Sequence, residues 1–242
     1  MTKTTKTHST KKAKSERFLL VFLLDRTGSM QACYDSTVSG FNEFLKEQRA
    51  EKSGQADMTL VKFDSHPGEP MCQVAYSARP IAEVALLGSE ENPYSPRGMT
   101  PLYDAVGQTI RVTESVATNY DHVLFIIQTD GQENSSREYN QRTVFDLVGK
   151  KREEGWDFIF LGADIDAYDA SQALNVPVAN TVSYDAGSQS VLAFASLSKA
   201  ASMYRSTAGV TGGAVDALAD APVARPDGSG VPKGKKPKVA GL

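Results

Sequence analysis

Continuous apolar runs, separated by stretches with helical periodicity, dominate the middle of the chain. The strands of a parallel sheet are apolar at nearly every position because helices cover both of its faces. This pattern predicts strands at 18–24, 58–63, 123–127, 158–161 and, more weakly, 181–184. Residues 71–76 follow a turn-forming stretch at 65–68, and we expect them to form an antiparallel edge strand beside 58–63.

Helical patterns fill the gaps between these strands. Apolar residues recur at helical spacing within 38–45, 102–110, 144–148 and 191–203. We expect Asp35 or Ser36 to cap the first helix, Thr100 followed by Pro101 to cap the second, and Gly155 to end the third. Strands that alternate with helices predict an α/β fold, a three-layer doubly wound and mostly parallel sheet with helices on both faces.

The two ends of the chain differ in composition from its middle. Residues 1–15 hold no aromatic or branched aliphatic residue, and no aromatic residue follows position 206. Such segments bury too little apolar surface to offset the entropy of ordering. We therefore expect a disordered basic arm at 1–16, one domain at 17–205 and a flexible tail rich in Gly, Pro and Lys at 206–242, with a marginal helical turn at 214–219.

Charge is distributed unevenly along the chain. The formal net charge of -3 combines +5 over residues 1–17 and +4 over residues 225–242 with -12 between them. The acidic body does not favour nucleic acid. The basic ends could contact phosphates, but only weakly, since no aromatic residues interleave with the lysines for stacking. A nucleic-acid-associated or phage virion accessory protein that binds through its basic ends stays open as the alternative function.

Cysteine usage and hydropathy indicate the compartment. The chain has only two cysteines, Cys33 and Cys72, so a reducing environment is the simpler interpretation. The longest apolar run, 18–24, has seven residues and is too short to cross a membrane. We expect a cytoplasmic protein with no membrane partner.

Oxygen-bearing side chains follow two of the predicted buried strands. Asp25, Thr27 and Ser29 stand at alternate positions after one strand, Asp130 follows another, and Thr100 precedes a helix between them. Ligands of open α/β sheets bind at the carboxyl ends of the strands. Oxygen-only shells suit hard cations, and Mg²⁺ takes only one or two carboxylates. The sequence therefore predicts a Mg²⁺ site at these five residues, with Mn²⁺ or Ca²⁺ as alternative ions.

The same five residues resemble the metal-ion-dependent adhesion site (MIDAS) of von Willebrand factor A (vWA) domains. That pattern is D-x-S-x-S after the first strand, a distant Thr and a later Asp, and Asp25, Thr27, Ser29, Thr100 and Asp130 fill it in order. Thr27 replaces the more usual Ser and keeps the hydroxyl. The resemblance covers residues 17–205. It implies a Rossmann-like vWA fold and metal-dependent capture of a partner protein, which often supplies an Asp or Glu to the metal, rather than catalysis.

A further set of residues resembles an intracellular bacterial and phage branch of this family, to which the stress-associated TerY-like proteins are related. The residues that carry this closer resemblance are Gly40, Phe41, Asn42, Phe44, 97–105, Gly155, Trp156, Phe158, Leu161, Gly162 and Ala163. Branch members serve different machineries, so the resemblance names no partner.

Four residues flank the predicted metal site and are candidates for the rim of a partner-binding surface: Arg26, Gln132, Glu133 and Asn134. Solvated loop residues are the alternative interpretation of all four.

A phosphatase-like motif occurs after the strand at 158–161. Asp164 and Asp166 imitate the D-x-D motif of haloacid-dehalogenase-like phosphatases, but Tyr168 stands where that motif has Thr or Val. A helix cap explains Asp164 or Asp166 better, and we expect no enzymatic activity.

Overall fold

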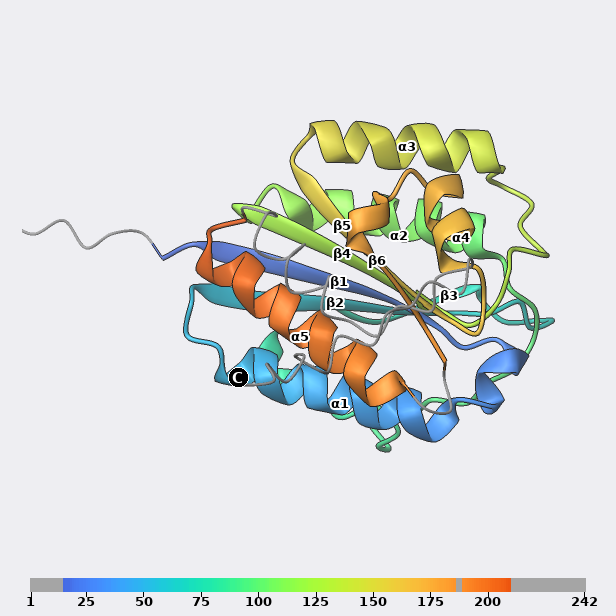
Figure 1. The fold of residues 1–242 in the computed structure, drawn as a ribbon, viewed down its shortest axis with the longest axis horizontal. Helices are drawn as coiled ribbons and strands as arrows, with labels where there is room; N and C mark the ends of the chain where they lie inside the picture. The colour runs from blue at the N-terminus through green and yellow to red at the C-terminus, as the bar shows by residue number, and fades with distance from the viewer. Residues whose placement is uncertain (1–14, 186–188, 210–242) are drawn as a thin grey trace, which may run out of the picture.

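The computed structural model describes residues 15–185 and 189–209, whose fold is drawn in Figure 1. The predicted basic arm lies outside these residues except for Ser15 and Glu16. The predicted tail beyond residue 209, with its helical turn at 214–219, also lies outside them. The predicted boundaries of the arm, domain and tail therefore stay predictions.

Within the described residues, six strands form one sheet in the order β3-β2-β1-β4-β5-β6. The strands are β1 (Arg17–Asp25), β2 (Gln55–Phe63), β3 (Cys72–Pro80), β4 (His122–Thr129), β5 (Trp156–Ala163) and β6 (Thr181–Tyr184). Neighbouring strands are parallel except for β2 and β3, which are antiparallel. This arrangement confirms the predicted sheet with its antiparallel edge strand.

Helices cover both faces of the sheet, as Figure 1 shows. On one face lie α1 (Tyr34–Ala50) and α5 (Ser190–Ser206), and on the other lie α2 (Leu102–Ala117), α3 (Gln141–Glu153) and α4 (Ala167–Ala173). The predicted three-layer α/β architecture is therefore confirmed. Among the described residues, no helix is both long and apolar enough to span a membrane.

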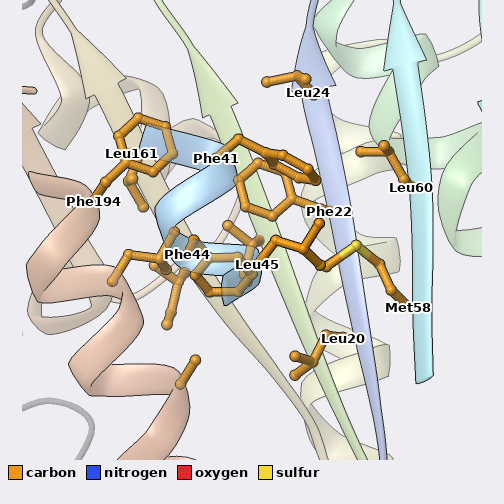
Figure 2. Close-up of a cluster of buried hydrophobic side chains, with 14 of the residues drawn as sticks. Leu20, Phe22, Leu24, Phe41, Phe44, Leu45, Met58, Leu60, Leu161 and Phe194 are labelled. Atoms are coloured by element: carbon orange, nitrogen blue, oxygen red, sulfur yellow. The ribbon is translucent and has the colours of Figure 1, made fainter. Parts of the chain in front are cut away.

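The central strand β1 supplies side chains to both hydrophobic layers. Residues 18–25 of this strand are fully buried, and alternate side chains enter the cluster under α1 and α5 or the one under α2 and α3. Phe22 packs edge-on against Phe41 and Phe44 of α1, with ring centroids 5.1 and 5.5 Å away (Figure 2). Burial on both faces explains why β1 is a continuous apolar run.

Two predicted helix caps are wrong. The N-cap of α1 is Cys33 rather than Asp35 or Ser36, because a short 3-10 helix at Gly28–Gln31 leads directly into α1. The N-cap of α2 is Pro101, and Thr100 makes no capping bond. Free amide groups at the start of α2 donate instead to side chains of the loop after β4, so this helix is capped by a distant segment.

Two other predicted helix boundaries are confirmed. Gly155 follows the last turn of α3 with φ +91°, a left-handed conformation that favours glycine and ends the helix. The Asp166 side chain caps α4 by accepting the Asp169 N–H at 3.1 Å. The D-x-D sequence therefore contains a helix cap, as expected.

Candidate metal centre

The predicted metal ligands lie in loops at one edge of the sheet. Strands β1 and β4 are parallel neighbours with Leu24 opposite Gln128, so Asp25 and Asp130 leave the sheet at the same edge. Asp25 is the last residue of β1, and Asp130 directly follows β4. The loop that ends at Thr100 runs beside them, because the Gly28 N–H donates to the Gly98 carbonyl oxygen at 3.1 Å.

Asp25 is fully buried at the end of β1. Its Oδ1 accepts the Thr27 N–H at 2.6 Å, and its Oδ2 accepts the Thr129 hydroxyl at 2.5 Å. Burial raises the pKa of Asp25 to about 7, although the hydrogen bonds from Thr129 and Thr27 act in the opposite direction. A cation beside this carboxylate would favour its charged form.

A chain of hydrogen bonds continues from this carboxylate to the second one. The hydroxyls of Thr27 and Ser29 lie 3.2 Å apart, and the Ser29 hydroxyl donates to Asp130 Oδ1 at 2.6 Å. Burial raises the pKa of Asp130, and the Ser29 hydrogen bond partly offsets this rise. The structure therefore brings four of the five predicted ligands, Asp25, Thr27, Ser29 and Asp130, into one connected group.

Thr100 lies beside this group without a hydrogen bond to it. A Cβ built on Gly131 would stand 2.8 Å from the Thr100 hydroxyl oxygen, so Thr100 is next to the residue that follows Asp130. Both backbone polar groups of Thr100 are hydrogen-bonded to Asn134. The Thr100 N–H donates to Asn134 Oδ1 at 2.8 Å, and the Asn134 N–H donates to the Thr100 carbonyl at 3.0 Å. The loop after β4 thus fixes the position of Thr100.

Gly131→Ala is expected to weaken metal binding about 10-fold while changing the free energy of unfolding by less than about 1 kcal/mol. The new methyl group would stand 2.8 Å from the Thr100 hydroxyl oxygen and 3.3 Å from its Cγ2, so the Thr100 side chain would have to leave its present orientation. Isothermal titration with Mg²⁺ measures the change. Thr100→Val is the matched control, because it removes the same hydroxyl: the two losses should be similar, and unchanged affinity in both variants would contradict the assignment of Thr100.

The donor set fits a divalent cation. Neither Asp25, which is fully buried, nor Asp130, which is partly buried, forms an ion pair with a described lysine or arginine. Buried carboxylates without a cationic partner are costly, and a bound cation removes this cost. The described residues contain no group of three or more His, Cys, Asp or Glu side chains that could hold a metal. A site here would therefore depend on hydroxyl oxygens as well as on the two carboxylates.

The prediction of Arg26 as an open rim residue is wrong. Arg26 is 7% exposed. Its Nη1 donates to Gln73 Oε1 at 2.7 Å, and its Nε lies 3.1 Å from Asp64 Oδ2. The charge of Asp64, 38 positions further along the chain, draws this side chain inward, which the local sequence did not indicate.

The other three rim candidates lie in the loop after β4. The Glu133 carboxylate accepts N–H groups of Tyr103, Ser135 and Ser136, so it holds the start of α2. Asn134 binds the Thr100 backbone, as described above. Gln132 is exposed, and its role at the rim stays a prediction.

Two residues that support Asp25 were missed from the sequence. Thr129 donates to the Asp25 carboxylate, and the Tyr94 hydroxyl donates to the Asp25 main-chain oxygen at 2.7 Å. Thr129 could have been found, because it stands just before Asp130 at a strand end. Tyr94 lies in a long irregular segment, and no local pattern indicates its contact with β1.

No protein-family model matches this chain, and no curated protein matches its sequence. Solved structures do match its fold. Proximal thread matrix protein 1 (PTMP1) from the mussel byssus superposes with a TM-score of 0.61 and 14% identity, over 78% of this chain and 47% of that chain. This chain thus spans about half the length of PTMP1. A second PTMP1 structure, with a zinc-occupied MIDAS motif, matches at TM-score 0.51 and 13% identity, over 76% and 48% of the two chains.

Two bacterial structures are also similar in fold. One is the vWF domain of the type V pili tip protein Mfa5 from Porphyromonas gingivalis, with a TM-score of 0.60 and 9% identity over 79% of this chain and 97% of that one. The other is a von Willebrand factor type A protein from Catenulispora acidiphila, with a TM-score of 0.54 and 14% identity over 81% and 43%. These matches and the sheet topology show that the chain has the fold of a von Willebrand factor A domain.

Proposed function

We propose that this chain is a metal-dependent protein-binding domain and not an enzyme. The observation that carries the proposal is the group of one buried carboxylate, one partly buried carboxylate and three hydroxyl residues at the carboxyl edge of the sheet, with no described lysine or arginine paired to either carboxylate. The zinc-occupied MIDAS of PTMP1, a protein of similar fold, supports it. In this proposal Asp25, Thr27, Ser29, Thr100 and Asp130 hold the ion directly or through water.

We infer Mg²⁺ as the ion, with Mn²⁺ or Ca²⁺ as alternatives. Oxygen donors from carboxylates and hydroxyls suit hard cations, and two carboxylates at most neutralise a divalent charge. When bound, the ion would supply an electrophilic position that accepts one more anionic ligand. A carboxylate of a partner protein is the ligand that we propose.

A hollow beside the candidate site extends the proposed binding surface. It has a volume of about 270 Å³ and lies between the start of α2, the loop after β4 and α4. Glu133, Asp166 and Asp169 are among the residues that line it, and no lysine or arginine does so. A partner that presents a carboxylate to the ion would meet this acidic hollow, so a cationic side chain close to that carboxylate would favour binding.

Partner capture from bacterial lysate tests the proposal. Three baits are compared in parallel. Two of them, the purified wild-type full chain and the variant Asp25→Asn, are used with Mg²⁺, and the third is the wild type in EDTA. We expect a protein band only with intact Asp25 and Mg²⁺. A band that persists in EDTA and with Asp25→Asn would overturn metal-dependent capture.

Deletion of the basic ends tests the alternative function. The chain carries +5 over residues 1–17 and +4 over residues 225–242. If these ends bind nucleic acid or a virion, removal of residues 1–14 and 225–242 should abolish capture even with Mg²⁺. Retention of the band would support partner binding at the proposed metal site.

We propose a cytoplasmic setting and a place in the bacterial and phage TerY-like branch. The closer resemblance at 97–105 and at Gly155, Trp156 and Phe158 supports this. Cys33 and Cys72 are both free thiols, which agrees with a reducing compartment.

A further inference from the structure

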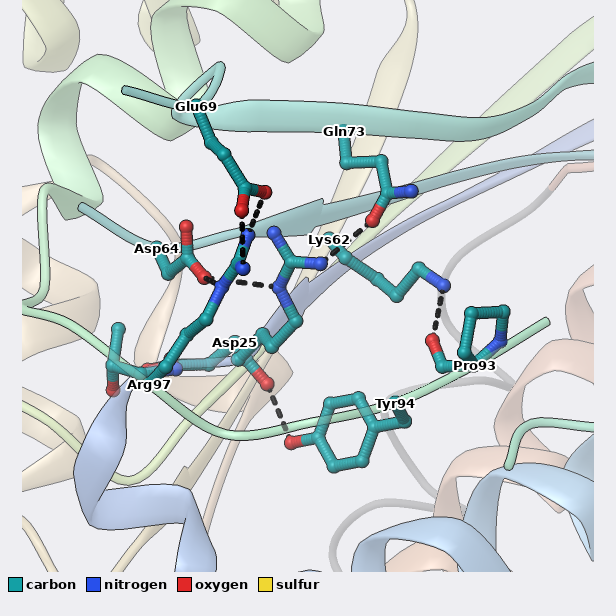
Figure 3. Close-up of polar contacts among 10 residues, drawn as sticks. Asp25, Lys62, Asp64, Glu69, Gln73, Pro93, Tyr94 and Arg97 are labelled. Carbon is teal, nitrogen blue, oxygen red and sulfur yellow. Dashed lines mark hydrogen bonds and ion pairs between the residues drawn. The ribbon is translucent and has the colours of Figure 1, made fainter. Parts of the chain in front are cut away.

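Asp64 is a buried carboxylate on which two arginine side chains converge. It follows β2 directly and is fully buried. Its Oδ2 lies 3.1 Å from the Nε of Arg26 and accepts a hydrogen bond from the Nε of Arg97 at 2.7 Å (Figure 3). Arg97 also pairs with Glu69 in the same β2–β3 connection. Buried charges of this kind are costly unless they are paired, so loss of the Asp64 charge would leave Arg26 as an uncompensated buried cation.

Each of the two arginines belongs to a loop that carries proposed metal ligands. Arg26 lies between Asp25 and Thr27, and Arg97 precedes Thr100 by three positions. The ion pairs therefore join two separate loops through one residue that belongs to neither of them.

Backbone hydrogen bonds join the loop that contains Arg26 to the loop that contains Arg97. The Arg97 N–H donates to the Arg26 carbonyl at 2.8 Å, and the Gly28 N–H donates to the Gly98 carbonyl at 3.1 Å. On the other side, the Ser65 N–H donates to the Met99 carbonyl at 3.0 Å. Thr100, which has no capping bond of its own, follows this three-way junction directly.

Removal of the Asp64 charge would leave several cations close together. Arg26 is 7% exposed, and Lys62, two positions before Asp64, is 1% exposed. Burial, and to a lesser extent the nearby Arg26, lowers the pKa of Lys62 to about 8. Without Asp64, the two arginines would separate or draw in water, and the loops that they anchor would move with them.

We propose that Asp64 is a positioning residue for the metal site. It does not contact the ion. It clamps the loop of Thr27 and Ser29 to the loop of Thr100, so that their hydroxyls face the same position as Asp25 and Asp130. This role rests on the proposed function, but the clamp itself is a property of the metal-free chain and can be measured without an ion.

The test compares Asp64→Asn with Asp57→Asn in the full chain. Asp57 lies near the other end of β2, where its Oδ2 accepts hydrogen bonds from Arg17 Nη2 at 3.3 Å and from the Tyr120 hydroxyl at 2.6 Å. A second pair replaces the first if Asp64→Asn does not fold. In this pair Arg97→Gln is the test variant and Arg17→Gln is its control. Two quantities are measured for each variant: amide hydrogen exchange without metal, and Mn²⁺ affinity by titration.

For Asp64→Asn and Arg97→Gln, we expect exchange at the Gly28 and Arg97 amides to rise at least 10-fold and Mn²⁺ affinity to fall at least 10-fold. The two controls should leave both quantities unchanged. Unchanged exchange and affinity in Asp64→Asn and Arg97→Gln would overturn the inference, and so would exchange that rises equally across the whole chain. If the wild type binds no Mn²⁺ but exchange at the two amides still rises, the clamp is supported and the proposed function fails.

Discussion

Asp25→Asn is expected to lower Mg²⁺ affinity at least about 100-fold, or about 2.7 kcal/mol, while the fold stays intact. The amide side chain has the same shape, and its oxygen can still accept a hydrogen bond from Thr129 or Thr27. It lacks the charge that a divalent cation requires. Isothermal titration measures the affinity, and circular dichroism checks the fold. Affinity within a few-fold of the wild type would contradict the role of Asp25.

The same variant has a second expected effect, on stability without metal. Burial raises the pKa of Asp25 to about 7, so the folded state keeps its proton where the unfolded chain has lost it. This group therefore makes the wild type less stable as pH rises from about 4 to about 7, and Asn does not titrate. In metal-free urea denaturation, the stability of Asp25→Asn relative to the wild type should be greater at pH 8 than at pH 5.

Gly98→Ala is expected to destabilise the chain by about 2 kcal/mol or more and to disrupt metal binding as well. Gly98 has φ +71°, and an added Cβ would stand 2.4 Å from the Ser65 carbonyl oxygen, a backbone atom that cannot turn away. The loop would have to separate from Ser65, and Thr100 would be displaced with it. Urea denaturation and Mg²⁺ titration measure the two effects.

Gly68→Ala is the matched control for this substitution. Gly68 lies in the neighbouring β2–β3 connection with φ +83°, but its added Cβ would meet no atom within 4 Å. This control carries the cost of a left-handed alanine, about 1 kcal/mol, without the collision. It should bind Mg²⁺ as the wild type does. Equal effects of the two substitutions would show that the contact between Gly98 and Ser65 does not position the site.

The strands were predictable because burial on both faces leaves a strong local pattern. In β1, residues 18–24 are apolar without interruption, and all of them are fully buried. The edge strand β3 was harder to delimit: it reaches Pro80, beyond the predicted end at residue 76, because its half-exposed positions show no apolar run. Burial pattern, rather than intrinsic propensity, decided how much of the sheet could be predicted.

The candidate site was predictable where its residues follow strand ends. Asp25 and Asp130 come directly from the ends of parallel neighbours, so the topology alone brings them together. The environment of Thr100 was not predictable, because the Asn134 side chain and the Ser65 backbone, both distant in sequence, determine it. The burial of the Arg26 side chain beside Asp64 was not predictable for the same reason, because contacts between segments distant in sequence leave no local pattern.

The central claim is that one divalent cation binds at Asp25 and Asp130. Titration of the metal-free wild type with Mn²⁺, followed by electron paramagnetic resonance of the free ion and by competition with Mg²⁺, tests it most directly. The account predicts one bound Mn²⁺ per chain, displaced by Mg²⁺ and absent from the variant Asp25→Asn. A wild type that binds no Mn²⁺, or a variant that binds it equally well, would contradict the account.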